Sequence, residues 1–303
     1  MVDSELARAH QAVGPRGESV WQHEARLLQA LWRQRARLAP AGEGPGDGVR
    51  LTSADGVAMC NFLSPAARRS AESTGPWAAG GSAKERATRQ QDLLSTQTLC
   101  HNIFGPLAEA PGDPRAAEAL RLLEPDLAII EHVAFDVAAK KGNADVIGRP
   151  SSFQTVIDYR DAKGAARSLA IKARYAEGHS GGALQLPESA VAVMRRSGVF
   201  GRLDPLDLPP RCNALLREHV ATIVMNVHAR RRARFVYLYP LRHEKASQAV
   251  SVYREYLRES AGFAAHTLED AVAALRWAYG EKWVEDLYGR YLDPTVIRRA
   301  ARG

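Results

Sequence analysis

Alternating apolar and polar residues predict a β-hairpin between residues 149 and 177. Residues 152–160 and 168–175 are each rich in β-branched and aromatic side chains, and the sequence Asp-Ala-Lys-Gly between them is typical of a tight turn. The period of a strand places Lys172 and Arg174 on one face of the second strand. Two like charges on one face of a central strand are costly, so we expect this face to open onto a site.

Further elements are predicted on both sides of this hairpin. Apolar runs predict one strand before it and one after it, at residues 126–136 and 235–241. Apolar residues at helical spacing predict helices over residues 18–38, 64–72, 82–103, 115–123, 187–197, 213–230, 243–260, 267–276 and 281–292. Gly105 and Pro106 are expected to end or kink the third of these helices. The order predicts an α/β fold, with a mixed central sheet of about four strands flanked by helices and a helical N-terminal portion.

Composition and charge narrow the class of protein. Of the 303 residues, 46% are hydrophobic and 25% are charged, which is ordinary for a globular protein. No apolar run is long enough to span a bilayer, and the N-terminus lacks the apolar core of a signal peptide. The three cysteines lie far apart, as expected of reduced thiols in a cytoplasmic protein. A net charge of +7 favours a nucleic-acid partner without requiring one.

Two charged features leave alternatives open at this point. Arg230, Arg231 and Arg232 lead into the last predicted strand, where they either bind phosphates or form a solvated turn. Glu131 interrupts the apolar run of the first predicted strand. A lone carboxylate there is either a site residue or a structural charge with a partner.

Several blocks of sequence, taken together and in order, resemble the PD-(D/E)XK nuclease superfamily, and within it a bacterial, restriction-endonuclease-like branch. The blocks are NFLSPAARRSAE at 61–72, LLSTQTLCHNIFGPL at 93–107, IIEHV at 129–133, SSFQTVIDYRD at 151–161, LAIKARYAE at 169–177, FVYLYP at 235–240 and TLEDAVAAL at 267–275. The resemblance implies a restriction-endonuclease-like domain over residues 61–303. Residues 1–60 are then a helical extension packed on its core.

In this family one carboxylate opens the second strand, and a carboxylate and a lysine lie two residues apart on the third. The carboxylates hold Mg²⁺, which activates water, and the lysine stabilises charge. Here the matching positions hold Gln154, Lys172 and Arg174, with Glu131 on the preceding strand. The trio changes from two carboxylates and one lysine (−1) to one amide and two cations (+2). Charges about 4 Å apart interact by roughly 4 kcal/mol at an effective dielectric of 20, so Lys172 repels a divalent cation.

The first interpretation is therefore a catalytically inactive nuclease fold that needs no cofactor and binds nucleic acid, DNA before RNA, through a basic pocket. Its contacts are expected to be Lys172, Arg174, Arg149, Arg230, Arg231 and Arg232. By analogy of fold alone, genome maintenance or defence against foreign DNA is its expected role.

Two other interpretations stay open. The protein is an active Mg²⁺-dependent DNA endonuclease whose metal ligands have moved to Glu131, Asp158 and Glu177. Alternatively it is a non-enzymatic subunit of a larger complex. In that case Lys172 and Arg174 are expected to pair with Glu131 and Asp158.

Overall fold

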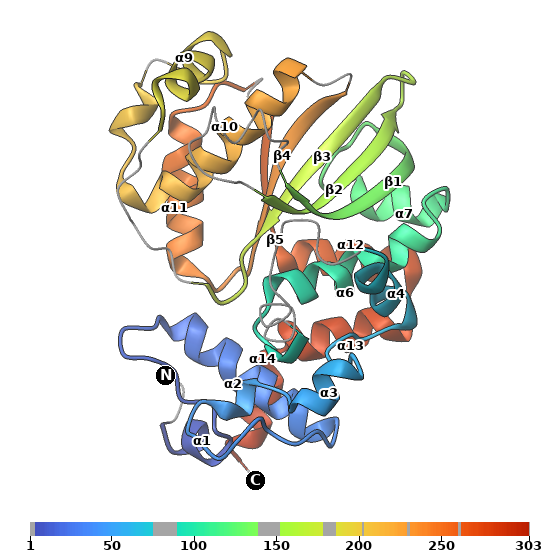
Figure 1. Cartoon of the computed structure of the whole chain (residues 1–303), viewed down its shortest axis with the longest axis vertical. Helices are drawn as coiled ribbons and strands as arrows, with labels where there is room; N and C mark the ends of the chain where they lie inside the picture. Colours follow the sequence, from blue (N-terminus) through green and yellow to red (C-terminus); the bar gives the residue numbers. More distant parts are fainter. Residues whose placement is uncertain are drawn as a thin grey trace. The chain divides into compact units, whose positions relative to one another are not determined.

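A computed structural model describes residues 4–74, 90–138, 152–177, 186–201, 203–228, 231–259 and 262–302 of the chain. The chain forms two compact units (Figure 1). Unit 1 comprises Met1–Glu109, Arg174–Gly178 and Val272–Gly303, and unit 2 comprises Ala110–Ala173 and His179–Ala271. The boundaries of these units differ from those of the predicted extension, 1–60, and the predicted domain, 61–303. The division into extension and domain stays a prediction.

Unit 2 is built on a five-stranded sheet with the strand order β1-β2-β3-β4-β5. The strands are β1 Leu127–Ala138, β2 Ser152–Asp161, β3 Ala166–Ala173, β4 Arg232–Tyr239 and β5 Phe263–Thr267. The first three strands pair antiparallel, and β3, β4 and β5 pair parallel. The predicted hairpin (β2 and β3) and the predicted mixed sheet are thereby confirmed.

The fifth strand, β5, was not predicted from the sequence, which indicated about four strands. Its sequence, FAAHT, is short and contains two alanines, so it carries little strand propensity of its own. It is placed by pairing with β4, where Phe235 lies beside Phe263 and Tyr237 beside Ala265. A neighbouring strand, which no local pattern reveals, therefore decides the structure of this segment.

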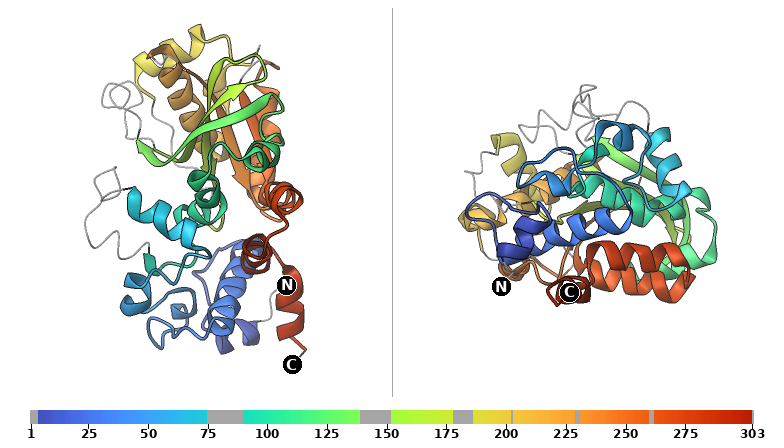
Figure 2. Two further views of the ribbon diagram at one scale, coloured as in Figure 1. Left: turned by 90° about the vertical axis from the view of Figure 1, so that its right-hand side faces the viewer. Right: turned by 90° about the horizontal axis from the view of Figure 1, so that it is seen from below.

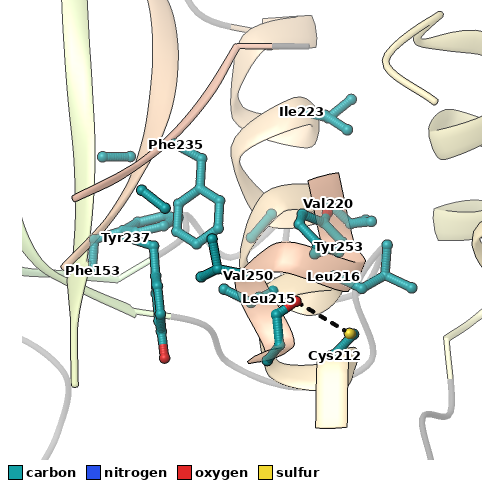
Figure 3. Packing of buried hydrophobic residues seen from close by; sticks show 14 of the residues in the cluster. Phe153, Cys212, Leu215, Leu216, Val220, Ile223, Phe235, Tyr237, Val250 and Tyr253 are labelled. Atoms are coloured by element: carbon teal, nitrogen blue, oxygen red, sulfur yellow. Dashed lines mark hydrogen bonds between the residues drawn. The ribbon is translucent and has the colours of Figure 1, made fainter. Parts of the chain in front are cut away.

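Helices α10 and α11 cover one face of the sheet in unit 2 (Figure 1). Phe153 and Phe235 from the strands belong to one buried apolar cluster with Leu216 and Val220 of α10 and Tyr253 of α11 (Figure 3). This apolar packing holds α10 against β4. The helices of unit 2 are α7 Pro114–Leu120, which packs on β1, α9 Glu188–Arg196, α10 Asn213–His228, α11 Glu244–Glu255 and the first turn of α12 Leu268–Tyr279, with short 3-10 turns at Pro205–Asp207 and Pro210–Cys212.

Unit 1 is helical, and its N-terminal and C-terminal segments pack together. Helix α2 begins with a capping box, in which Ser19 accepts from the Gln22 amide and Gln22 accepts in return from Ser19. Helix α2 contacts α13 and α14 (Figure 2). None of the described helices is both long and apolar enough to span a membrane. The helices are α1 Ser4–Ala9, α2 Val20–Arg35, α3 Ser53–Val57, α4 Pro65–Ser73, α6 Thr96–Glu109, most of α12, α13 Lys282–Tyr291 and α14 Pro294–Ala300, with a 3-10 turn at Asp47–Val49.

Helix α6 differs from its prediction at both ends. It begins at Thr96 rather than at residue 82, and residues 75–89 lie outside the described part of the chain. It also continues through Gly105 and Pro106 to Glu109, so it does not end at these two residues, and the kink that was the other expectation there stays a prediction. A Cβ at Gly105 would lie 2.7 Å from the Cα of Ala67 on α4. The glycine therefore serves the close packing of two helices rather than a helix end.

Buried His101 of α6 is expected to make unit 1 sensitive to acid. Its side chain is fully buried, Nδ1 lies 2.9 Å from Ser70 Oγ, and burial lowers its pKa to about 3. The unfolded chain binds the proton near pH 6.5, so the folded state loses stability as pH falls from about 6.5 towards 3. The loss attributable to this group is at most about 1.4 kcal/mol per pH unit.

Urea unfolding of wild type and His101→Asn between pH 7 and pH 4 measures this effect. The variant starts less stable, because it loses packing, but its stability falls less steeply with acid. His23→Asn, at a side chain that is 40% exposed, is the control and keeps the wild-type slope. Equal slopes for wild type and His101→Asn would contradict the prediction.

Candidate functional site

The start of β2 and the end of β3 lie side by side in unit 2. The antiparallel register, in which Thr155 faces Ile171, places Gln154 opposite Lys172. On its other side Lys172 lies beside Tyr237 of β4. Two of the positions predicted from the family pattern therefore come together at one end of the sheet.

The Lys172 ammonium makes two contacts inside unit 2. Nζ donates a hydrogen bond to the Ser152 carbonyl oxygen at 2.7 Å and lies 3.7 Å from Oε1 of Glu218 on α10. The two charged side chains are only 13% and 11% exposed. Water therefore screens this ion pair far less than a surface pair. Glu218 largely neutralises the charge that the sequence places on this face.

The side chain of Gln154 holds the end of β3. Its Oε1 accepts from the Ala173 amide at 3.2 Å, and its Nε2 donates to the Ala173 carbonyl at 3.4 Å. A carboxylate could make the first contact but would repel the carbonyl oxygen of the second. The amide is thus suited to a structural role at this position.

Arg174 follows the last residue of β3 and belongs to unit 1. Its side chain is partly exposed, and no ion pair joins it to another described residue. An arginine guanidinium can form paired hydrogen bonds to a phosphate. Arg174 is therefore the better of the two predicted cations for contact with an external anion.

Glu131 lies at the other end of the sheet from Gln154 and Lys172. It accepts from Arg160 Nε at 2.7 Å and from Arg231 Nη1 at 2.5 Å. Hydrogen bonds from Arg231 and then Arg160 lower the pKa of this carboxyl. Six residues of β2 separate Gln154 from Arg160, or about 20 Å of strand. The structure thus does not bring Glu131 to the other predicted catalytic positions.

The arginine run before β4 also lies away from Lys172. Arg232 pairs with Arg167 at the start of β3, and five residues, or about 17 Å of strand, separate Arg167 from Lys172. Arg232 is exposed, and Arg231 is bound to Glu131. Two other predicted contacts, Arg149 and Arg230, lie outside the described residues.

The three carboxylates considered as relocated metal ligands have other partners. Asp158 accepts a hydrogen bond from Ser168 Oγ at 2.6 Å. Asp158 and Glu131 both act on Arg231, because the hydrogen bond to Glu131 and then the charge of Asp158 raise the pKa of its guanidinium. Glu177 belongs to unit 1, where the Tyr175 amide, at 2.8 Å, and the Thr96 hydroxyl donate to it. The Arg231 guanidinium therefore lies beside Glu131 and Asp158, where a relocated metal ion would have to bind.

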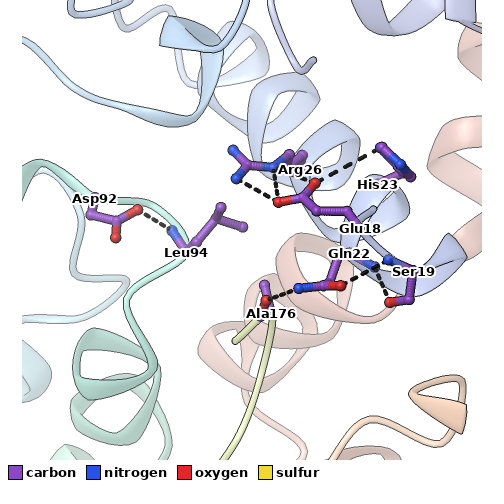
Figure 4. A network of polar contacts seen from close by, with 8 residues as sticks. All are labelled: Glu18, Ser19, Gln22, His23, Arg26, Asp92, Leu94 and Ala176. Atoms are coloured by element: carbon purple, nitrogen blue, oxygen red, sulfur yellow. Dashed lines mark hydrogen bonds and ion pairs between the residues drawn. The ribbon is translucent and has the colours of Figure 1, made fainter. Parts of the chain in front are cut away.

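The charge of Glu177 acts on a second acid of unit 1, Asp92, which Figure 4 shows beside the Leu94 amide. Burial raises the pKa of the Asp92 carboxyl, and the charge of Glu177 adds to the rise, while a hydrogen bond from the Leu94 amide opposes it. Figure 4 also shows Arg26 bound to Glu18, at 2.8 Å. Asp92 and Glu177 are thus two acids that influence each other, and Arg26, the basic residue whose charge also acts on Asp92, is already paired with Glu18.

The ion pairs predicted for a purely structural role, those of Lys172 and Arg174 with Glu131 and Asp158, are wrong. Lys172 pairs with Glu218 rather than with Glu131 or Asp158, and Glu131 binds Arg160 and Arg231. An internal salt bridge does exist at Lys172, but its carboxylate comes from a helix 46 residues further along the chain.

Two acidic residues near Lys172 and Gln154 were missed from the sequence. Glu218 is one, and its signal is that it is the single carboxylate in the sequence of α10, where it stands between Arg217 and His219. The other is Asp136, which the register of β1 and β2 places opposite Gln154. It is 5% exposed and has a φ of +53°, a conformation that aspartate tolerates better than most residues.

The Mg²⁺ that the resemblance implies does not fit these residues. Mg²⁺ requires several oxygen ligands, usually with carboxylates among them. At the matching positions Gln154 already accepts from the backbone, and Lys172 places an ammonium where a carboxylate would bind metal. Within the described ranges no three His, Cys, Asp or Glu side chains gather as a metal site. We therefore derive no metal-dependent step for this site.

Comparison with known proteins places the whole architecture in one family. A family model described as the PD-(D/E)XK nuclease superfamily matches residues 16–293, which include all five strands of the sheet. No curated protein and no solved structure gives a significant match. Because this model matches most of its length, the chain belongs to the PD-(D/E)XK nuclease superfamily.

Proposed function

We propose that this protein binds nucleic acid, DNA before RNA, and does not cleave it at the position where its superfamily carries the nuclease site. One observation carries the proposal. The Lys172 ammonium lies 3.7 Å from Glu218, at the position that the family resemblance assigns to a metal-binding carboxylate. A cation at this position repels the divalent ion on which phosphodiester hydrolysis of this type depends.

Charge supports the binding half of the proposal. Nucleic acid is the substrate class that membership of a nuclease superfamily implies. The chain carries a net charge of +7, which favours association with a polyanion. Because Lys172 is engaged by Glu218, we expect Arg174 rather than Lys172 to make the phosphate contact at this position.

The two alternatives have less support. An active endonuclease with relocated ligands needs Glu131, whose carboxylate is bound by two guanidiniums. A non-enzymatic subunit of a complex is compatible with the internal Lys172–Glu218 pair, and an assay of nucleic-acid binding separates it from our proposal.

Gel retardation and cleavage assays on the same samples test the proposal. Single-stranded and duplex DNA and RNA are incubated with the protein in chelator, in Mg²⁺ and in Mn²⁺. We expect retardation in chelator that weakens steeply with salt, and no cleavage in any condition. Arg174→Ala is expected to weaken binding and to lower the salt slope by about one. Arg298→Ala, an exposed arginine of α14 in the same unit, is the matched control.

Each half of the proposal can fail separately. Metal-dependent cleavage by the wild-type protein contradicts the loss of catalysis. Absence of retardation for all four nucleic acids at low salt contradicts binding and favours the subunit role. The triple variant Gln154→Asp, Lys172→Glu, Arg174→Lys adds a sharper arm. Cleavage that appears only in this variant assigns the loss of activity to these three residues.

A further inference from the structure

Lys172 Nζ lies among oxygen atoms supplied by two elements of unit 2. The Ser152 carbonyl comes from the start of β2, at 2.7 Å, and the Glu218 carboxylate comes from α10, at 3.7 Å. Carbonyl and carboxylate oxygens are also the ligands of hard divalent cations. Two oxygen atoms of kinds that also bind divalent cations thus hold the ammonium.

Packing makes Glu218 a fixed feature of this site. Its helix is anchored in the apolar core of unit 2 by Leu215, Leu216 and Val220, which are all buried in the cluster shown in Figure 3. The Glu218 side chain is only 11% exposed. A largely buried carboxylate is costly unless a positive charge lies near it, and Lys172 supplies that charge.

We propose that the Lys172 ammonium is a built-in cation that takes the place of a bound divalent ion, with Glu218 of α10 as its anionic ligand. The inference concerns unit 2 alone and does not depend on nucleic-acid binding. It follows that the wild-type protein needs no metal to hold this end of the sheet. It also follows that removal of the ammonium leaves a negatively charged oxygen site, which a divalent cation can enter.

Thermal unfolding of Lys172→Met with and without metal tests this inference. Methionine keeps most of the side-chain volume but removes the charge. In chelator we expect the melting temperature to fall by about 3 °C or more, and millimolar Mn²⁺ or Ca²⁺ to restore at least half of the loss. The same metals should not shift the wild type. Lys163→Met, in the exposed turn between β2 and β3, is the matched control and should show neither effect.

The melting temperature of the double variant Lys172→Met, Glu218→Gln should not change with metal. This result would assign the metal response of Lys172→Met to the Glu218 carboxylate. A folded Lys172→Met protein without a metal response, or a wild type with an equal response, overturns the inference. If Lys172→Met does not fold, Glu218→Gln is compared with the double variant. In Glu218→Gln the Lys172 ammonium has lost its carboxylate, whereas the double variant contains neither charge. The double variant should therefore melt at a higher temperature than Glu218→Gln. An equal or lower melting temperature overturns the inference. No nucleic acid is present, so these outcomes are independent of the proposed function.

Discussion

Arg290→Ala is expected to destabilise the protein by about 4 kcal/mol or more. Arg290 of α13 is fully buried in unit 1, and burial lowers its pKa. Its guanidinium donates to Gln29 Oε1 at 2.9 Å, to the Asn61 carbonyl at 2.7 Å and to Asn61 Oδ1. It also lies over the Trp32 ring, 3.8 Å from the centroid. Alanine would leave a cavity and several buried acceptors without a donor, each worth about 1–3 kcal/mol.

Urea unfolding followed by tryptophan fluorescence measures this loss. Arg290→Lys is expected to be intermediate, because it keeps the charge but not the planar fork that reaches both Gln29 and Asn61. Arg298→Ala, on the exposed side of α14, removes the same charge and should change stability little. A loss below about 1 kcal/mol for Arg290→Ala would show that the acceptors find other donors or water.

Restoring the family's carboxylate alone is expected to weaken the fold rather than to restore a nuclease. Lys172→Glu places a second carboxylate beside Glu218 in a site whose side chains are 13% and 11% exposed. We expect a loss of about 3–5 kcal/mol at pH 7 in chelator, the cost of a buried charge without its counter-ion. The repulsion raises the carboxyl pKa in the folded variant. The folded state therefore binds a proton more tightly than the unfolded chain, and the loss shrinks as pH falls from 7 to 5.

Urea midpoints at both pH values, with and without Mn²⁺, measure this effect. Lys163→Glu makes the same charge change in an exposed turn and serves as the control. The same small loss in both variants, independent of pH, would mean that Glu218 moves away from its new neighbour. The inference about the built-in cation would then lose its anionic ligand.

The local pattern was sufficient to predict the hairpin and its charged face. Strand period places Lys172 and Gln154 correctly, and antiparallel pairing brings them opposite each other. The helices with strong apolar stripes and caps, such as α2, were predicted within a few residues of their observed ends. These features depend on neighbours in the sequence, which local physical rules describe well.

Partners distant in the chain could not be predicted in the same way. Glu218 meets Lys172 because α10 packs on β4, the strand that pairs with β3, and nothing in either segment specifies that packing. Glu131 was predicted near the site, but the register of β1 and β2, which shifts between Ile130 and His132, directs it to Arg160 and Arg231. A charge in a strand reveals that it needs a partner, whereas long-range packing decides which partner it finds.

The way the chain is divided between the two units has a consequence for its synthesis. All strands of unit 2 lie between residues 110 and 271, so its sheet is complete before the last stretch, Val272–Gly303, is made. Unit 1 requires that stretch, because Arg290 binds Gln29 and Asn61, which precede it by 261 and 229 residues. During translation Gln29 and Asn61 must therefore wait for Arg290. We expect unit 1 to close after the sheet of unit 2, although unit 1 includes residues made before that sheet, against the usual order in which earlier parts fold first.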